Sequence, residues 1–374
     1  YAFLRRTAPS ALVPDPTRSF DVSASALGSL SAFYFCAYTA VQLPTGLMAD
    51  RWGSRRLLTF AALASAIGGL LFASTDSIDL AGIGRLLVGA GAGFGFICTL
   101  RIAMDWFPQK RLALLTGMTM MLGMLGGFTG QAPLALAVAE FGWRASMIAV
   151  ASFGMLIGLG TWLMAQDRRP DGTSSARHSE PVLSGLKGVL KRTQTRVIAI
   201  YGFTIIPPLF AFGTLWAVPF LQQVHGMTRP DAALSASLVL IGFGVFSPIV
   251  GWLSDRFKRR KPPMLFAAIF SLLTIVPIVY MQDLSSISIK ALMFLNGVAV
   301  AGMAVSFAAV REHNDSAHGG TSMAFHNMSM AISGAIMQTV IGWLLDESGL
   351  GVIDYGVRIY PATFYETALT VLPV

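Results

Sequence analysis

Two adjacent arginines, Arg5 and Arg6, lie in an apolar segment at the start of the 374-residue sequence. A charge inside an apolar segment is costly unless it faces a water-filled cavity or a partner of opposite charge. The planar guanidinium group donates paired hydrogen bonds that match the oxygens of a carboxylate or a phosphate. The pair therefore predicts a binding site for the anionic group of a small solute.

Two further arginines, Arg85 and Arg101, fall in the apolar stretch 79–104. On a helix they are separated by about 24 Å and lie on faces about 160° apart, so they cannot hold one small ligand together. Arg101 and Asp105 are four residues apart and share one face. They either form a structural ion pair or serve substrate binding and coupling, and Arg85 is likewise either a packing charge or a coupling residue.

Several polar side chains interrupt the apolar stretches of the second part of the chain. The candidates for substrate contact are Tyr201, Trp216, Asn296, His326 and Asn327. Such residues can bind a solute in a transport cavity, and they can equally form hydrogen bonds between helices. His326 has a side chain that ordinarily titrates near neutral pH, so it is either a proton-binding residue or a packing residue.

The composition indicates which elements must position these residues. Hydrophobic residues make up 54% of the chain and charged residues 12%, and the mean hydropathy is +0.63. A soluble domain could not cover so much apolar surface with so little charge. The sequence therefore predicts an all-α membrane protein that contacts the lipid bilayer, and not nucleic acid, although its net charge is +8.

Ten apolar stretches reach the length of about 20 residues that a spanning helix needs. They are 24–48, 57–75, 79–104, 112–138, 145–166, 197–223, 231–254, 262–282, 286–310 and 317–344. The apolar segments 1–13 and 361–374 are shorter, and we expect each to belong to a helix that is truncated in this chain. Twelve transmembrane helices are therefore predicted.

The connections are short and polar except for residues 167–196, a basic linker that contains Pro, Gly and Ser. The linker separates an N-terminal half, 1–166, from a C-terminal half, 197–374, with six predicted helices each. Lysine and arginine number 18 on the linker's side of the predicted membrane and 5 on the other side. Because basic loops are retained in the cytoplasm, both termini and the linker are predicted to be cytoplasmic, with the protein in the inner membrane.

The two halves repeat a charged loop. GLMADRWGSRR at 46–56 and GWLSDRFKRRK at 251–261 align at an offset of 205 residues. The predicted gating residues of these Asp-Arg loops are Gly46, Asp50, Arg51, Arg55, Asp255 and Arg256. A glycine lets two helices approach closely, an aspartate can accept hydrogen bonds at the N-terminus of a neighbouring helix, and an arginine can pair with an acid. The second copy has Lys258 where the pattern expects glycine.

The pattern G-x-x-x-D-R-x-G-x-R-R resembles the signature loop of the major facilitator superfamily, and the resemblance covers essentially the full chain. It implies the family's fold of twelve helices in two six-helix repeats, a substrate site at their interface, and transport by alternating access. Arg85, in the context G-R-x-L-x-G-x-G, is similar to the family's fourth-helix arginine, which is often tied to proton coupling. The glycines after Arg85 predict close helix packing and not a dinucleotide loop, because no strand precedes them.

Four segments, LRRTAPS, DWFPQKR, FGTLWAVPFL and GAIMQTVIGWLLD, are similar to bacterial nutrient permeases of the phagosomal-transporter type and to organic-anion symporters. Phosphate-ester members carry a second arginine in the seventh helix, whereas stretch 197–223 has none. The predicted function is therefore secondary active transport of a small carboxylate-bearing solute, such as an organic acid, an amino acid or a peptide, in symport with protons. The alternative is proton-antiport efflux of drugs or siderophore-like compounds.

The sequence predicts no enzyme, no cofactor and no metal site, because it has no Ser/His/Asp, HExxH or cysteine cluster at a plausible membrane position. The expected partners are a small-molecule substrate, protons and the lipid bilayer, and the expected state is a monomer. Pro207 and Pro208 are predicted to break or kink the helix of stretch 197–223, which suits a helix that moves during gating.

Overall fold

The computed structural model describes residues 24–129, 132–167, 182–281, 283–315, 318–347, 352–354, 357–359 and 362–372. Nine helices within these ranges are long and apolar enough to cross a membrane. They cover nine of the ten predicted stretches, and the remaining stretch, 24–48, forms helix α3 (Ala24–Trp52). The segment 1–13, with Arg5 and Arg6, lies outside the described residues.

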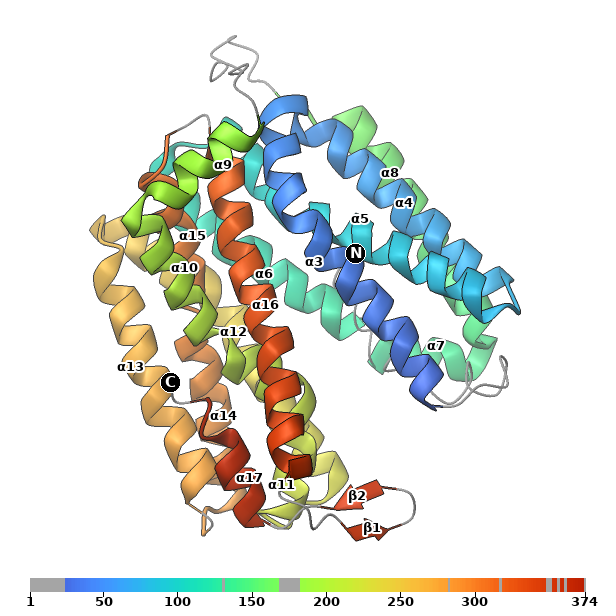
Figure 1. Ribbon diagram of the computed structural model, residues 1–374, viewed down its shortest axis with the longest axis vertical. Helices are drawn as coiled ribbons and strands as arrows, with labels where there is room; N and C mark the ends of the chain where they lie inside the picture. Colours follow the sequence, from blue (N-terminus) through green and yellow to red (C-terminus); the bar gives the residue numbers. More distant parts are fainter. Residues whose placement is uncertain are drawn as a thin grey trace. The chain divides into compact units, whose positions relative to one another are not determined.

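The helices follow one another along the chain with short connections (Figure 1). After α3, the N-terminal half contains α4 (Ser54–Ser74), α5 (Ile78–Trp106), the turn η1 (Gln109–Arg111), α6 (Leu112–Thr129), α7 (Ala132–Phe141) and α8 (Trp143–Met164). The linker contains α9 (Val182–Lys191). The C-terminal half contains α10 (Thr193–Ile205), the π-helix η2 (Pro208–Trp216), α11 (Ala217–Gln223), α12 (Arg229–Phe257), α13 (Lys261–Tyr280), α14 (Ser286–Val300), α15 (Met303–Glu312), α16 (Gly319–Glu347) and α17 (Ala362–Leu369). An antiparallel hairpin of β1 (Val352–Asp354) and β2 (Val357–Ile359), which was not predicted, connects α16 to α17.

Three of the predicted spans are interrupted. The stretch 112–138 is shared by α6 and α7, and the stretch 286–310 is shared by α14 and α15. In 197–223 the interruption has a plain cause, because Pro207 and Pro208 have no N–H to continue the α-helical hydrogen bonds. The chain passes from α10 through η2 to α11 at this point, so the predicted break is confirmed.

The two halves repeat the same helix packing. In the N-terminal half α5 packs against α3 and α4, and in the C-terminal half α14 packs against α12 and α13. A Cβ atom on Gly89 of α5 would overlap the backbone of Tyr34 in α3, and one on Gly297 of α14 would overlap the carbonyl oxygen of Val239 in α12. The glycines of stretch 79–104 therefore serve close packing, as predicted.

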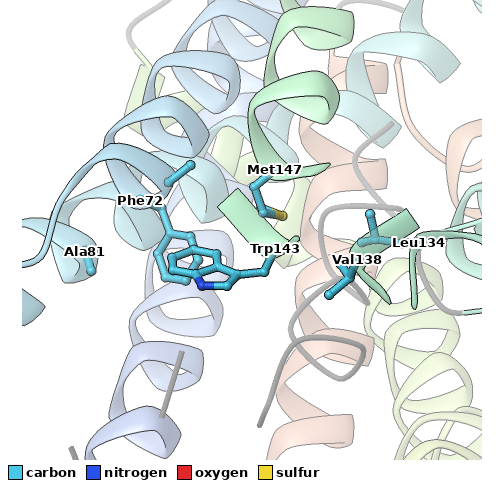
Figure 2. Packing of buried hydrophobic residues seen from close by; sticks show 7 residues of the cluster. Phe72, Ala81, Leu134, Val138, Trp143 and Met147 are labelled. Atoms are coloured by element: carbon cyan, nitrogen blue, oxygen red, sulfur yellow. The ribbon is translucent and has the colours of Figure 1, made fainter. Parts of the chain in front are cut away.

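A hydrophobic core cluster joins α4, α5, α7 and α8 at the end of α4 that lies far from the first Asp-Arg loop (Figure 2). Its members are Phe72, Ala73, Ala81, Leu134, Val138, Trp143 and Met147. The ring of Trp143 meets the ring of Phe72 edge to face, with 5.8 Å between the centroids. Such an aromatic pair contributes about 0.5–1.5 kcal/mol beyond the area that it buries. The cluster holds this end of the four helices together.

The residues group into two compact units that cross the boundary between the predicted halves. Unit 1 is Tyr1–Gln109, Leu122–Thr195 and Arg311–Met328, and unit 2 is Lys110–Met121, Arg196–Val310 and Ser329–Val374. The start of α6 is thus grouped with helices of the C-terminal half, and the start of α16 with helices of the N-terminal half. The division of the chain at the linker stays a prediction.

Candidate functional site at the two Asp-Arg loops

The first Asp-Arg loop is held by the end of α8. The backbone N–H of Arg55 donates to Oδ1 of Asp167 over 2.7 Å, so a carboxylate lies at the N-terminus of α4, where the helix dipole favours negative charge. The guanidinium group of Arg55 donates to the carbonyl oxygen of Trp162 and lies 4.6 Å from the centre of the Trp162 ring. Arg55 therefore fixes the loop to α8. Asp50 and Arg51 lie in the last turn of α3.

The second Asp-Arg loop is organised by Asp255. Its Oδ2 accepts a hydrogen bond of 2.9 Å from the backbone N–H of Leu114, in the first turn of α6. Its Oδ1 accepts one of 2.6 Å from Nη1 of Arg260, and the two side chains are only 8% and 12% exposed. Arg256 is exposed. The aspartate of this copy thus has the geometry expected of the repeat, at the N-terminus of a helix from the other half.

The second position after the Asp-Arg pair has a positive φ in both copies. Gly53 has φ 86° and ψ 154°, a conformation that is essentially limited to glycine. Lys258, at the equivalent position, has φ 52° and ψ 33° in the left-handed region, which costs roughly 1–2 kcal/mol for a residue with a side chain. Glycine is favoured at this position of the repeat because the backbone has a positive φ, and Lys258 adopts that conformation with strain.

Substitutions at these two positions are expected to have opposite effects on stability. Lys258→Gly should raise the free energy of unfolding by roughly 0.5–1 kcal/mol, because glycine removes the strain. Gly53→Ala should lower it by about 1–3 kcal/mol, and the new Cβ would also overlap the carboxylate of Asp167. Thermal unfolding in detergent tests both changes. If both substitutions changed the free energy of unfolding equally, the backbone strain at Lys258 would be contradicted.

The glycine that opens each copy packs against the first turns of a helix from the other half. In unit 1, a Cβ on Gly46 would lie 2.5 Å from the Cβ of Ala324 and 2.7 Å from the carbonyl oxygen of Gly320, both in α16. In unit 2, a Cβ on Gly251 would overlap the carbonyl group of Ala113 in α6. We call these contacts the Gly46 seam and the Gly251 seam. Neither seam has room for a side chain.

The arginines of α5 both have partners. The Nε atom of Arg101 lies 3.6 Å from Oδ1 of Asp105, and the Arg101 side chain is 10% exposed. The guanidinium carbon of Arg85 lies 5.1 Å from the centre of the Tyr34 ring in α3, and Arg85 is buried. The structure thus brings together Arg101 with Asp105 and keeps Arg85 in a separate environment, as the helical spacing predicted.

Asn327 contacts another helix of unit 1. Its Nδ2 donates a hydrogen bond of 2.8 Å to Oε1 of Gln42 in α3, and Gln42 is completely buried. Among the described residues Nε2 of Gln42 has no hydrogen-bond partner, and such a buried donor costs about 1–3 kcal/mol. The neighbouring His326 is also buried. Gln42 was not predicted, although a glutamine inside an apolar stretch is a signal of such a contact.

Helix α16 supplies hydrogen bonds to the carbonyl groups of α10 and η2 in unit 2. The Oγ of Ser333 donates to the carbonyl oxygen of Phe203, which receives no hydrogen bond from Pro207 because proline has no N–H. Farther along, Nε2 of Gln338 donates to the carbonyl oxygen of Phe210 over 2.7 Å. Within a membrane an unsatisfied carbonyl costs several kcal/mol, so the Ser333 contact replaces the hydrogen bond that Pro207 removes at Phe203.

Trp216 and Tyr201, two other predicted substrate residues in the span 197–223, have different surroundings. The Nε1 of Trp216 donates to the backbone carbonyl of Gln338 over 3.2 Å. The hydroxyl of Tyr201 is buried and has no hydrogen-bond partner in the part of the chain that the structure describes. Trp216 is therefore part of the contact between η2 and α16, whereas the Tyr201 hydroxyl retains its bonding capacity.

Asn296 points to α13. Its Nδ2 donates to Oγ1 of Thr274 over 2.9 Å and to both oxygens of Ser271 over 3.3 Å. The side chain is buried. The amide nitrogen of this predicted substrate residue therefore takes part in a contact between α14 and α13.

The described residues contain no group of three or more His, Cys, Asp or Glu that could hold a metal ion. Asp167 was not predicted, because it is the first residue of the predicted linker and its partner Arg55 lies 112 residues earlier. Its position directly after an apolar span, with an Asp-Arg loop elsewhere, is the available signal.

Comparison with known proteins yields matches along nearly the whole chain. The family model described as Major Facilitator Superfamily matches residues 1–228 and 208–373. The probable sulfoacetate transporter SauU of Cupriavidus necator is 22% identical over 381 residues, covering 93% of this chain and 85% of that protein. The probable sugar efflux transporter of Mannheimia succiniciproducens is 26% identical, covering 80% of this chain and 72% of that protein. The probable L-galactonate transporter of Escherichia coli is 24% identical, covering 63% and 54%.

Solved structures share the fold. The fucose:proton symporter FucP of Escherichia coli has a TM-score of 0.71 at 16% identity, over 100% of this chain and 95% of that chain. The proton:xylose symporter XylE has a TM-score of 0.70 at 14% identity, over 99% and 91%. At these identities the likeness concerns the fold.

Proposed function

Because this chain belongs to the major facilitator superfamily, we propose that it is a secondary active transporter that moves a small carboxylate-bearing organic solute across the inner membrane. Transport proceeds by alternating access in symport with protons. The observation that carries the proposal is the pair of seams, in which Gly46 and Gly251 each pack against a helix of the opposite half. Contacts of this kind close one side of the membrane and must separate when that side opens.

The seams lie at the Asp-Arg loops, which the distribution of lysine and arginine assigns to the cytoplasm. In the proposed cycle both seams are closed while the substrate site faces outward. The hydrogen bond from Leu114 of α6 to Asp255 stabilises this state, and it is lost when the cytoplasmic side opens. Arg260, in the same loop as Asp255, holds the carboxylate in place. Asp50, Arg51, Arg55 and Arg256 are proposed to act in the same closure.

A carboxylate is proposed because the basic side chains outnumber the acidic ones at the predicted site. Arg5, Arg6 and Arg101 are the proposed anion-binding residues, with Tyr201 offering a buried hydroxyl that has no partner within the described ranges. Two relatives support this class by their names, since sulfoacetate and L-galactonate both contain a carboxylate. Proton coupling is proposed to involve Arg85, Asp105 and His326.

A thermal-shift screen tests the substrate class. Sulfoacetate serves as the probe carboxylate, alongside L-galactonate, amino acids and short peptides. A solute present at 100 times its dissociation constant stabilises the fold by about 2.7 kcal/mol. Arg5→Met and Arg6→Met should weaken binding of the carboxylate that gives the largest shift by roughly 10–100-fold, the value of a lost charge-assisted hydrogen bond.

Arg144→Met is the matched control for the arginine substitutions. Arg144 pairs with Asp76 on the surface, and the two side chains are 42% and 87% exposed, so this pair contributes little. If Arg5→Met and Arg6→Met bind the solute as tightly as Arg144→Met does, the proposed anion site is wrong.

Proton-antiport efflux is the second candidate function. It is favoured by the names of two relatives, the probable sugar efflux transporter of Mannheimia succiniciproducens and the multidrug resistance protein MdtL of Salmonella typhi, which is 25% identical over 233 residues. Against it, the helix of stretch 112–138 lacks the Gly-Pro pair of the antiporter motif. The two functions differ in the direction in which the solute moves relative to the protons.

A further inference from the structure

Helix α16 presents a stripe of three residues at four-residue spacing, in the pattern G-x-x-x-Q-x-x-x-G. The stripe consists of Gly334, Gln338 and Gly342, and steps of four residues keep side chains on one face of an α-helix. A Cβ on Gly334 would lie 3.2 Å from the Cβ of Phe210, and a Cβ on Gly342 would lie 3.2 Å from Cζ2 of Trp216. Both neighbours belong to the π-helix η2. The stripe on α16 is therefore shaped to receive η2.

The segment that the stripe receives has an unusual backbone. At the end of η2 the N–H of Ala217 donates to the carbonyl oxygen of Phe212, five residues earlier, whereas an α-helix joins residues four apart. Such π-helices are rare, are mostly limited to one turn and occur frequently at functional sites. η2 extends over nine residues, Pro208–Trp216. Each of its hydrogen-bonded turns thus contains one residue more than an α-helical turn.

The amide of Gln338 bonds to the backbone of η2. Its Nε2 donates to the carbonyl oxygen of Phe210 over 2.7 Å, and Oγ1 of Thr214 donates to the same oxygen over 2.6 Å. In an α-helix this carbonyl would accept from the N–H of Thr214, four residues later. Side-chain donors inserted at a carbonyl of the ladder compete with that N–H and distort the helix. Gln338 and Thr214 therefore favour the π-helical form at this turn.

The indole ring of Trp216 is fixed to the same stripe. Its Nε1 donates to the backbone carbonyl of Gln338 over 3.2 Å, and the edge of its six-membered ring lies over Gly342, where the missing side chain leaves a notch. The ring is half-buried, so part of its surface stays accessible. Conversion of η2 to an α-helix would turn Trp216 by about 100° for the residue that each turn loses, away from this notch.

We propose that Gln338 is a positioning residue of the solute site, which holds η2 in its π-helical form and thereby keeps the ring of Trp216 in the Gly342 notch. The ring then forms a fixed apolar wall for the carbon chain of the solute. The inference rests on the proposed transport function and takes Trp216 as the residue that contacts the solute. Gln338 acts through η2 and does not touch the solute itself.

Deletion of Leu215 tests the π-helix directly. Leu215 lies in η2 and its side chain is 49% exposed. Its removal takes away the surplus residue and lets η2 form α-helical turns while α11 keeps its packing. The melting temperature in detergent should stay within about 5 °C. Binding of sulfoacetate, measured by thermal-shift titration, should weaken at least about ten-fold, because the wall formed by Trp216 is displaced.

The matched control deletes Leu273 from α13, which is a regular α-helix. Leu273 is 62% exposed, but its deletion rotates the rest of the helix by about 100° against its neighbours. The melting temperature should therefore fall by at least about 10 °C. If deletion of Leu215 lowers the melting temperature as much as deletion of Leu273 does, η2 holds no surplus residue and the inference is wrong. Unchanged binding of sulfoacetate after deletion of Leu215 would also overturn it.

Gln338→Met removes the amide and keeps the size of the side chain. The KM of sulfoacetate uptake into proteoliposomes should rise about ten-fold while maximal uptake stays within about two-fold, because the site is altered and the later steps are not. The emission of Trp216, taken as the difference between each protein and its Trp216→Phe counterpart, should shift as the ring leaves the notch. Thr339→Val is the matched control, since Thr339 is the next residue of α16, is exposed and bonds to Ala335 of its own helix.

The control variant should change neither the KM nor the emission. An unchanged KM with unchanged emission in Gln338→Met would refute the positioning role, and so would equal changes in Thr339→Val. Failure of the proposed transport function has a different signature, because the unaltered protein then neither binds nor takes up any carboxylate. The melting temperatures and the emission of Trp216 need no solute, so they decide in either case whether Gln338 holds η2 in its π-helical form.

Discussion

Substitution of Gly46 by leucine is expected to abolish transport while the protein still inserts and folds. A Cβ at this position would lie 2.5 Å from the Cβ of Ala324 and 2.7 Å from the carbonyl oxygen of Gly320, and a leucine adds three more carbon atoms. Overpacking of a closed contact costs about 1–3 kcal/mol or more. Because α3 and α16 can relieve it by separating, the seam should remain open. We expect uptake to fall at least about 100-fold, measured in proteoliposomes with the probe carboxylate.

Two further variants serve as a second test and as a control for Gly46→Leu. Gly251→Leu should behave in the same way, because its Cβ would overlap the carbonyl group of Ala113. Gly160→Leu in α8 is the matched control, since a Cβ on Gly160 meets nothing within 4 Å, and it should transport normally. A Gly46→Leu protein with normal uptake would show that the Gly46 seam does not need to close.

Asp255→Ala is expected to shift the protein towards the state in which the Gly251 seam is open. The carboxylate accepts from the backbone N–H of Leu114 and from Arg260, and each charge-assisted hydrogen bond contributes about 1.5–3 kcal/mol. Loss of one such bond changes an equilibrium between two states roughly 10–100-fold. The shift should appear as faster maleimide labelling of a cysteine at Ser247, with a parallel fall in uptake. Ser247 is completely buried, and it packs against Gly117 of α6, one turn from Gly251.

The control for Asp255→Ala is Asp231→Ala. Asp231 pairs with Lys290 over 3.0 Å, but the two side chains are 47% and 28% exposed, so the pair contributes about 0–1 kcal/mol. Labelling at Ser247 should stay unchanged in that variant. Equal labelling of the two variants would mean that Asp255 does not stabilise the closed seam.

The positions of the helices were predictable because the thickness of a bilayer imposes a length on each span. The break at Pro207 and Pro208 was predictable for a similar reason, since proline cannot donate a backbone hydrogen bond. The close packing at Gly46 was predictable from the repetition of this glycine at Gly251. In each case the property belongs to the residue itself or to its periodic spacing, so no knowledge of distant neighbours was needed.

The hydrogen-bond partners of side chains were harder to predict from the sequence. From the sequence, Asn327 fits a cavity residue and a packing residue equally well. Its amide hydrogen-bonds to Gln42, 285 residues earlier in the chain, and this contact could not be predicted from residue types. Asn296 presents the same ambiguity, which its contacts with Ser271 and Thr274 in α13 resolve. The strain at Lys258 was visible in the sequence only as a departure from the repeat, since a backbone angle cannot be read from residue types alone.

Uptake of the probe carboxylate into proteoliposomes under an imposed pH gradient tests the proposed symport most directly. The vesicles contain purified protein, and the gradient is either acidic outside, absent or acidic inside. Proton symport predicts that the carboxylate accumulates above its external concentration only when the outside is acidic, and that a protonophore abolishes this accumulation. Accumulation only with an acidic lumen would establish antiport, and absence of uptake for every carboxylate that stabilises the fold would contradict the account.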